Sequence, residues 1–188
     1  MRQNERAPFL ATLHRARKCA YPPGEHVGQK SFLRAGEIRR LGRRARIGPG
    51  VPVLDLCCGV GGPGRYLAAV LGCRYLGVDR SASAVEIARR LAGDLPCRFE
   101  QLHVPPLPDD LFEVVLLLET MLASPDKRAL LGEVARVLVP GGRLAFTLEG
   151  APLTPRKGAA MPDADTVRLV ELAALTAVLA EKRQVEPR

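Results

Sequence analysis

A buried strand that breaks into a glycine-dense turn and restarts as a helix lies at residues 53–68, and it constrains the fold more than any other stretch. The strand segment, Val-Leu-Asp-Leu, is apolar apart from Asp55. The turn holds four glycines, which are Gly59, Gly61, Gly62 and Gly64. Pro63 suits the first turn of a helix, where its missing N–H has no partner to lose. Glycines permit positive φ and close approach of a ligand, and the free N–H groups at the helix start favour electron-rich ligand atoms. The stretch therefore predicts a nucleotide-type site.

Asp55 indicates which nucleotide fits. Gly59, Gly61 and Gly64 match the G-x-G-x-x-G pattern of dinucleotide sites, but Asp55 lies four residues before the first of them. A carboxylate aimed at a pyrophosphate repels it. S-adenosylmethionine carries an α-ammonium and a sulfonium, which the same carboxylate attracts. The motif therefore disfavours a NAD-dependent dehydrogenase and favours a cationic, sulfur-bearing nucleotide.

Three more motifs follow in the chain. Arg-Tyr-Leu-Gly-Val-Asp at 74–79 reads as a strand that ends in an acid, Phe-Glu-Val-Val occupies 112–115, and Leu-Val-Pro-Gly-Gly-Arg-Leu occupies 138–144. With residues 53–64 they resemble, in order, the motifs of the class I S-adenosylmethionine-dependent methyltransferases, although Glu113 replaces the usual Asp. This resemblance covers about residues 45–150. It implies S-adenosylmethionine as cofactor, S-adenosylhomocysteine as product, and no metal.

Alternating strands and helices predict an α/β fold, a Rossmann-like doubly wound parallel sheet whose ligands lie at the carboxyl ends of the strands. We expect strands at 52–57, 74–79, 97–102, 113–118 and 143–149. Helices are expected at about 31–46, 63–71, from Ser81 or Ser83 to 92, and from 124 to 138. Candidates for the last two strands that the family normally has are absent from the sequence.

The chain is expected to divide into three parts. Residues 1–48 form an N-terminal helical lid or cap, residues 49–150 the S-adenosylmethionine-binding core, and residues 151–188 a truncated C-terminal loop and helix. Without the last two strands, the fifth strand is an exposed apolar edge, which proteins normally cover or pair. Three alternatives stay open: the tail folds back, a second chain covers the edge as a homodimer or a partner, or the enzyme is shortened.

The resemblance also implies donor-binding residues. Asp55 would meet the α-ammonium, directly or through water, although a cap on the adjacent turn is the alternative. Asp79, at the end of the second strand, would accept hydrogen bonds from both ribose hydroxyls. The other implied donor contacts are Cys57, Gly59 and Gly61 at the methionine portion and Arg80, Gln101 and Leu102 at the adenine. Gln101 stands where the family usually has an acid.

Glu119 is the candidate catalytic residue. It lies just beyond the apolar strand at 114–118, where the transferring methyl lies in the family. It could act as a general base, or it could contact the sulfonium or the methionine portion of the donor. A plain turn acid is the alternative. Met121 is expected to form a pocket wall, and the resemblance makes Tyr21 and Gln29 candidates for the lid. His103 is a further candidate base.

Charge and cysteine content bear on partners and location. The formal net charge of +8 and the arginine clusters at 15–18 and 39–46 favour a nucleic-acid partner, whereas 4% aromatic residues and no tryptophan disfavour base stacking. Five cysteines without zinc-type spacing favour a reducing cytoplasm. No apolar run is long enough for a bilayer, so no membrane association is expected.

We therefore expect methyl transfer to an oxygen or nitrogen of a small-molecule acceptor. Two alternatives remain: an RNA methyltransferase, or a donor-binding but inactive or regulatory subunit.

Overall fold

The computed structural model describes residues 19–29, 31, 33–121 and 124–147. Within them, five parallel strands form one sheet in the order β3-β2-β1-β4-β5. The strands are β1 (Pro52–Leu56), β2 (Arg74–Asp79), β3 (Cys97–Gln101), β4 (Phe112–Leu117) and β5 (Leu138–Phe146). The expected Rossmann-like sheet is confirmed, and the strand order reverses between β1 and β4, which is where such sheets bind ligands.

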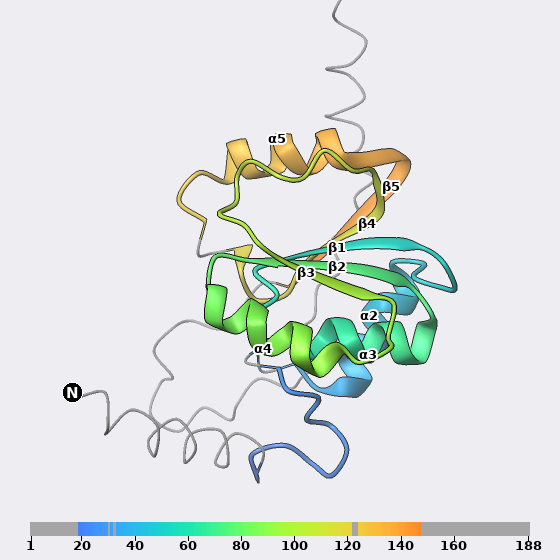
Figure 1. Cartoon of the computed structure of the whole chain (residues 1–188). Coiled ribbons are helices and arrows are strands. Elements are labelled where there is room, and N and C mark those ends of the chain that lie inside the picture. The colour runs from blue at the N-terminus through green and yellow to red at the C-terminus, as the bar shows by residue number, and fades with distance from the viewer. Residues whose placement is uncertain (1–18, 30, 32, 122–123, 148–188) are drawn as a thin grey trace, which may run out of the picture.

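Helices cover both faces of the sheet. On one face lie α2 (Ala35–Arg44), α3 (Gly62–Leu71) and α4 (Ala82–Ala92), and on the other lies α5 (Lys127–Val137) (Figure 1). Two hydrophobic clusters fill the two interfaces, one containing Val53 and Leu67 and the other Leu54 and Val134. Alternate side chains of β1 therefore pack into the clusters on opposite faces of the sheet, because successive side chains of a strand point to opposite faces.

The helix caps refine the sequence expectations. Ser81, and not Ser83, caps α4: its hydroxyl accepts a hydrogen bond from the backbone N–H of Ala84, at 3.3 Å. Asp126 caps α5 in the same way through Ala129, at 2.9 Å. The helix expected at 31–46 is shorter than that range, since α2 begins only at Ala35.

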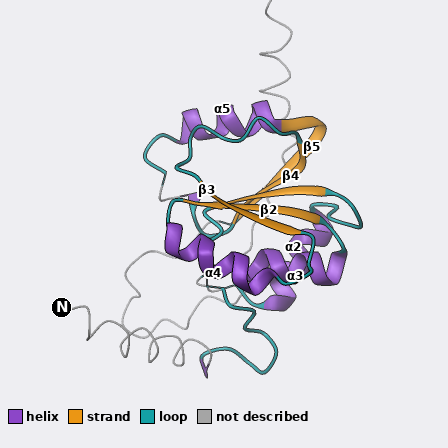
Figure 2. Cartoon of the chain, in the orientation of Figure 1, coloured by secondary structure: helices purple, strands orange, loops and turns teal. Residues whose placement is uncertain are grey.

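The connection from β3 to β4 contains no helix and lies along α5 instead (Figure 2). Two α5 side chains hold it there. Glu133 accepts a hydrogen bond from the backbone N–H of Leu107 at 2.9 Å, and Arg136 donates to the Leu107 carbonyl at 2.8 Å. This loop and α5 together form the outer layer on that face.

The start of β5 was expected at residue 143 but lies at Leu138. Leu138 pairs with Phe112 and Arg143 pairs with Val114, so the Pro-Gly-Gly turn is a bulge within the strand and not a loop before it. Among the described residues, β5 pairs only with β4.

The expectations for residues 1–18 and 151–188 lie outside the described residues. None of the helices in the described part of the chain has the length and apolar character that crossing a bilayer needs.

Candidate functional site

A cavity of about 390 Å³ lies where β1, β2 and β4 end and the glycine turn begins. Three carboxylates line it, from Asp55, Asp79 and Glu119. No lysine, arginine or histidine is among the lining residues that the structure describes. The cavity is therefore strongly acidic, in a chain whose net charge is +8.

Three residues that line this cavity each carry a buried polar atom with no hydrogen-bond partner within the described residues. The atoms are Oδ1 of Asp55, Oγ of Ser31 and Oγ1 of Thr120. Buried polar atoms in native proteins are nearly always satisfied. Their gathering around one cavity indicates a place for a polar ligand or water.

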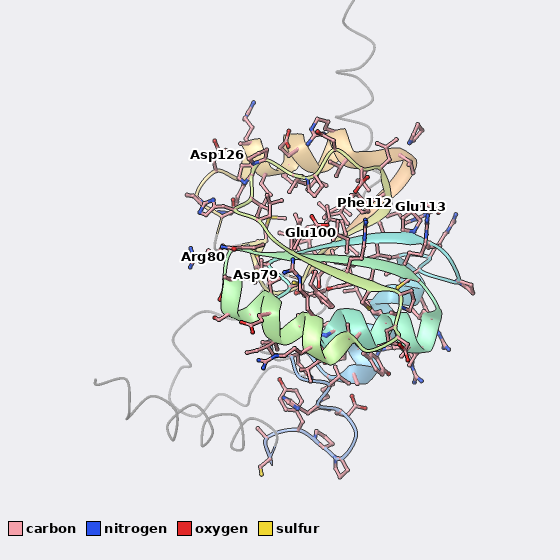
Figure 3. All side chains as sticks on the ribbon, in the orientation of Figure 1. Asp79, Arg80, Glu100, Phe112, Glu113 and Asp126 are labelled. Atoms are coloured by element: carbon pink, nitrogen blue, oxygen red, sulfur yellow. The ribbon has the colours of Figure 1, made fainter. Side chains whose placement is uncertain are left out.

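A second cavity, of about 300 Å³, shares Cys57, Asp79 and Thr120 with the first. Its other lining residues are mostly apolar, with Leu102 and Val104 on one side and Arg80 and His103 among the polar exceptions. The two cavities lie at one end of the sheet. Figure 3 shows Asp79 and Arg80 at that end, opposite Phe112 and Glu113 at the start of β4. The arrangement offers an acidic compartment beside a more apolar one.

The glycines of the turn differ in what lies beside them. Gly59, with φ of 56°, has open space where a Cβ would lie, so its backbone is accessible from the cavity. A Cβ on Gly61 would lie 2.6 Å from Cζ of Phe99, and one on Gly64 would overlap the ring of Tyr75. Gly61 and Gly64 thus lack side chains for a packing reason, because they make room for a buried aromatic pair. Its ring centroids are 5.7 Å apart. The donor contact expected at Gly61 stays a prediction.

Gly62 admits the chain's own N-terminal loop. A Cβ there would lie 2.6 Å from the carbonyl carbon of Gly28, so the loop can lie on the start of α3 only if residue 62 has no side chain. The loop thereby brings Gly28, Gln29 and Ser31 to the acidic cavity.

Gln29 organises this loop through its own amide. Its Oε1 accepts from the N–H of Val27 at 2.6 Å, and its Nε2 donates to the carbonyls of Glu25 and Leu33, at 2.9 and 2.7 Å. Both amide hydrogens are thus used within the loop. The Tyr21 hydroxyl donates to the carbonyl of Ser31. Both expected lid residues lie in the loop, where they make hydrogen bonds that fasten it.

Asp55 is 2% exposed and lies at the centre of the site. The Tyr75 hydroxyl donates a hydrogen bond to its Oδ2. Burial raises the pKa of this carboxyl from 3.8 to about 7; the Tyr75 hydrogen bond opposes the rise, and the nearby charge of Asp79 adds to it. Near neutral pH the carboxyl is therefore poised between its neutral and charged forms.

The raised pKa of Asp55 predicts that Asp55→Asn changes the stability of the protein by an amount that depends on pH. The unfolded chain ionises Asp55 near pH 3.8, but the folded chain does so only near pH 7. The folded state thus binds the proton more tightly, and the wild-type carboxyl costs stability increasingly as pH rises from 4 to 7. The full penalty is about 4 kcal/mol. Urea unfolding at pH 5 to 8 should show that the free energy of unfolding of the variant, relative to the wild type, increases up to about pH 7 and stays constant above it. A constant difference at every pH would contradict the burial argument.

Asp79 is held by two backbone N–H groups. Its Oδ2 accepts from Gly59 at 2.8 Å, and its Oδ1 accepts from Ser81 at 2.9 Å. Each carboxylate oxygen keeps a further lone pair. The carboxylate is thus fixed at the boundary of the two cavities and can still accept from a ligand.

The residues expected at an adenine lie apart from one another. Arg80 and Leu102 line the second cavity. Gln101 is exposed, donates to the carbonyl of Arg80 at 3.3 Å, and lines neither cavity. Its assignment stays a prediction.

Glu119 lines the acidic cavity, with its backbone in the left-handed region at φ of 56°. Its N–H donates to Oγ1 of Thr147 beyond β5, at 2.8 Å. Met121 is 6% exposed and packs in the core on the α5 side, and it lines neither cavity. Position 57 also has positive φ, at 60°, although it is a cysteine. Sequence reasoning assigned no role to Ser31, Thr120 or Tyr75, because the motifs give no role to these positions, although Tyr75 lies within the 74–79 motif.

The part of the chain that the structure describes contains no group of three or more His, Cys, Asp or Glu side chains suited to a metal ion.

Comparison with known proteins agrees with this geometry. A model of a methyltransferase domain family matches residues 53–142. Methyltransferase GfsG of Streptomyces halstedii is 37% identical over 124 residues, which are 60% of this chain and 43% of that protein. Sterol 24-C-methyltransferase erg6 of Schizosaccharomyces pombe is 32% identical over 108 residues, which are 54% of this chain and 29% of that protein. The chain thus spans less than half the length of these curated relatives.

A solved structure adds a bound ligand. The S-adenosylmethionine-dependent methyltransferase from Geobacter sulfurreducens, in complex with S-adenosyl-L-homocysteine, is 25% identical and superposes with a TM-score of 0.54. The match covers 62% of this chain and 50% of that one.

Proposed function

Through residues 53–142 the chain belongs to the class I S-adenosylmethionine-dependent methyltransferases, and from this premise we propose that it binds S-adenosylmethionine and transfers the methyl group to a small-molecule acceptor. The chemistry is methyl transfer to oxygen or nitrogen. The sterol 24-C-methyltransferase among the relatives makes carbon the alternative acceptor atom.

The observation that carries the proposal is the charge of the first cavity. Asp55, Asp79 and Glu119 line it and no described cationic side chain does, so these carboxylates would repel a phosphate-bearing nucleotide. S-adenosylmethionine brings two positive groups, and its amino-acid portion and ribose offer hydrogen-bond donors to the unpartnered oxygens. The residues present therefore fit this cofactor.

Each wall of the site has a proposed part in holding the donor. Oδ1 of Asp55 receives the α-ammonium, and Asp79 accepts from the two ribose hydroxyls. The backbone at Cys57, Gly59 and Gly61 follows the methionine portion. Around the adenine lie Arg80, Gln101 and Leu102. Tyr21 and Gln29 fasten the loop that closes over this compartment.

The bound donor supplies a methyl group already activated on a sulfonium. What the protein adds is placement of an acceptor in line with that group, which contributes several kcal/mol through proximity. Glu119 lies in the wall of the same cavity, where its carboxylate can take a proton from the acceptor. A positioned base of this kind adds about 10²–10⁴-fold. Met121 then supports the wall from the core.

A second candidate function is methyl transfer to RNA, which one observation favours. On and just after α2 the side chains of Arg39, Arg40, Arg43, Arg44 and Arg46 are all exposed. Guanidinium groups on one outer surface can bind a phosphate backbone. Salt-dependent binding of RNA would support this candidate over a small molecule.

The compartment proposed for this activity is the cytoplasm. All five cysteines are free thiols, two of them buried, as a reducing compartment maintains them.

Calorimetric titration tests the proposal directly. We expect saturable binding of S-adenosylmethionine and S-adenosylhomocysteine and none of NAD. Turnover across an acceptor panel, followed as S-adenosylhomocysteine formed, should fall about 10²–10⁴-fold in Glu119→Gln while donor affinity changes little. Binding of NAD in place of the donor would overturn the proposal. Donor binding without turnover on any acceptor would favour an inactive or regulatory subunit.

A further inference from the structure

The Tyr75 hydroxyl, on β2, donates a hydrogen bond to Oδ2 of Asp55 on the neighbouring strand β1. We propose that Tyr75 is a positioning residue, which holds the Asp55 carboxylate with Oδ1 turned to the cavity so that it can receive the ammonium group of the donor. The inference rests on the proposed function and extends it to a residue that does not itself line the cavity.

The ring of Tyr75 is tightly enclosed by its neighbours. The residue is 2% exposed, and its ring lies where any side chain on Gly64 would be. A Cβ on Gly77 would lie 2.9 Å from Cε1 of the same ring. Phe99 packs against it at an interplanar angle of 57°. With a helix glycine, a strand glycine and a second ring around it, the hydroxyl is held in one place.

The hydrogen bond leaves Asp55 with one free oxygen. Oδ2 is occupied by the tyrosine hydroxyl, and Oδ1 is buried with no partner in the described residues. Asp55 also lines the cavity. A carboxylate fixed through one oxygen presents the other in a defined direction, and this preorganisation strengthens binding because less freedom is lost when the ligand arrives.

Tyr75 also affects the charge of Asp55. Its hydrogen bond is the one influence that lowers the pKa of the carboxyl, against the larger effect of burial and against Asp79. The other titratable groups near the carboxyl are the thiols of Cys57 and Cys58, whose pKa values are raised, first by burial, so both stay neutral. Glu119 lines the same cavity. Without the hydroxyl, the carboxyl would keep its proton to higher pH.

Donor binding is then coupled to the release of a proton from Asp55. The ammonium group arrives charged, Asp55 must be ionised to pair with it, and the proton that a neutral Asp55 carries is released to solvent. At pH 7 this amounts to about half a proton for each donor bound.

Calorimetry of the full chain with S-adenosylhomocysteine, from pH 6 to 8.5 and in two buffers of different ionisation enthalpy, tests the inference. Tyr75→Phe keeps the ring and removes the hydroxyl. We expect about tenfold weaker binding at pH 7 and a pH midpoint higher by about one unit. The loss should narrow to about twofold at pH 8.5, where the carboxylate has regained its charge but not its fixed direction. Tyr66→Phe removes the hydroxyl of a half-buried tyrosine on α3 and should leave the curve unchanged.

The outcomes separate the two proposals. If the wild type binds no S-adenosylhomocysteine at any pH, the proposed function fails and the inference with it. If the wild type binds but Tyr75→Phe gives the same curve, or is weaker by one factor at every pH, Tyr75 is only structural and the inference alone fails. A double variant separates an effect through Asp55 from a general loss of stability in Tyr75→Phe. In an Asp55→Asn background, adding Tyr75→Phe should leave the affinity unchanged, and a further loss there would overturn the inference.

Discussion

Gly64→Ala is expected to lower the free energy of unfolding by about 3 kcal/mol or more. The added Cβ would overlap the ring of Tyr75, which is 2% exposed and cannot rotate away because Phe99 packs against it. Either α3 moves off the sheet or the ring is displaced and its hydroxyl leaves Asp55. Urea unfolding measures the loss, and calorimetry of the remaining folded protein should show weakened donor binding.

Gly132→Ala is the matched control for this variant. Gly132 also lies within a helix, α5, but a Cβ there would meet nothing within 4 Å. Alanine should therefore stabilise the protein by about 0.5–1 kcal/mol through its higher helix propensity. Two glycine-to-alanine changes in helices should thus have opposite signs. A tolerated Gly64→Ala would show that the ring contact does not hold α3 in place.

Asp79→Asn is expected to weaken donor binding about hundredfold. The carboxylate accepts from the N–H groups of Gly59 and Ser81, one on each oxygen. In asparagine one of those oxygens becomes an NH₂ group, which faces a backbone N–H and has no lone pair for the ribose. Both the glycine turn and the ribose contact are then damaged. Calorimetry with S-adenosylhomocysteine measures the effect.

The control for this change is Asp94→Asn, at an exposed carboxylate beyond the end of α4. It alters the net charge by the same amount and should leave donor affinity unchanged. Circular dichroism must show that Asp79→Asn is folded at the temperature of the titration. If a folded Asp79→Asn protein binds the donor normally, the ribose role is wrong.

Sequence alone was enough for the sheet, because each strand carries its own signal. Residues 74–79 were expected as a strand and form β2 with those bounds. Asp55 and Asp79 could be placed together because motifs fix their positions near the ends of neighbouring strands, and both line the acidic cavity. Local patterns of this kind can be read from the sequence, because the strand and the turn beside it are formed by neighbouring residues of the chain.

Contacts between distant segments could not be predicted. The pairing of Tyr75 with Asp55 spans 20 residues, and the contact of Gly62 with the N-terminal loop depends on tertiary packing. The expected start of β5 was wrong for a related reason, since Leu138 joins the sheet only through its pairing with Phe112. The purpose of Gly64 could not be inferred, because a glycine has the same appearance in a sequence whether a ligand or a ring occupies the space beside it.

The acidic wall formed by Asp55, Asp79 and Glu119 bears on product release in the proposed reaction. Loss of the methyl group turns a sulfonium into a neutral thioether, so the spent molecule leaves with one positive charge fewer than it brought. The carboxylates that line the cavity therefore attract the product less strongly than the donor. The same acidic cavity that attracts the donor would thus also favour exchange of the spent molecule for a fresh donor after each turnover.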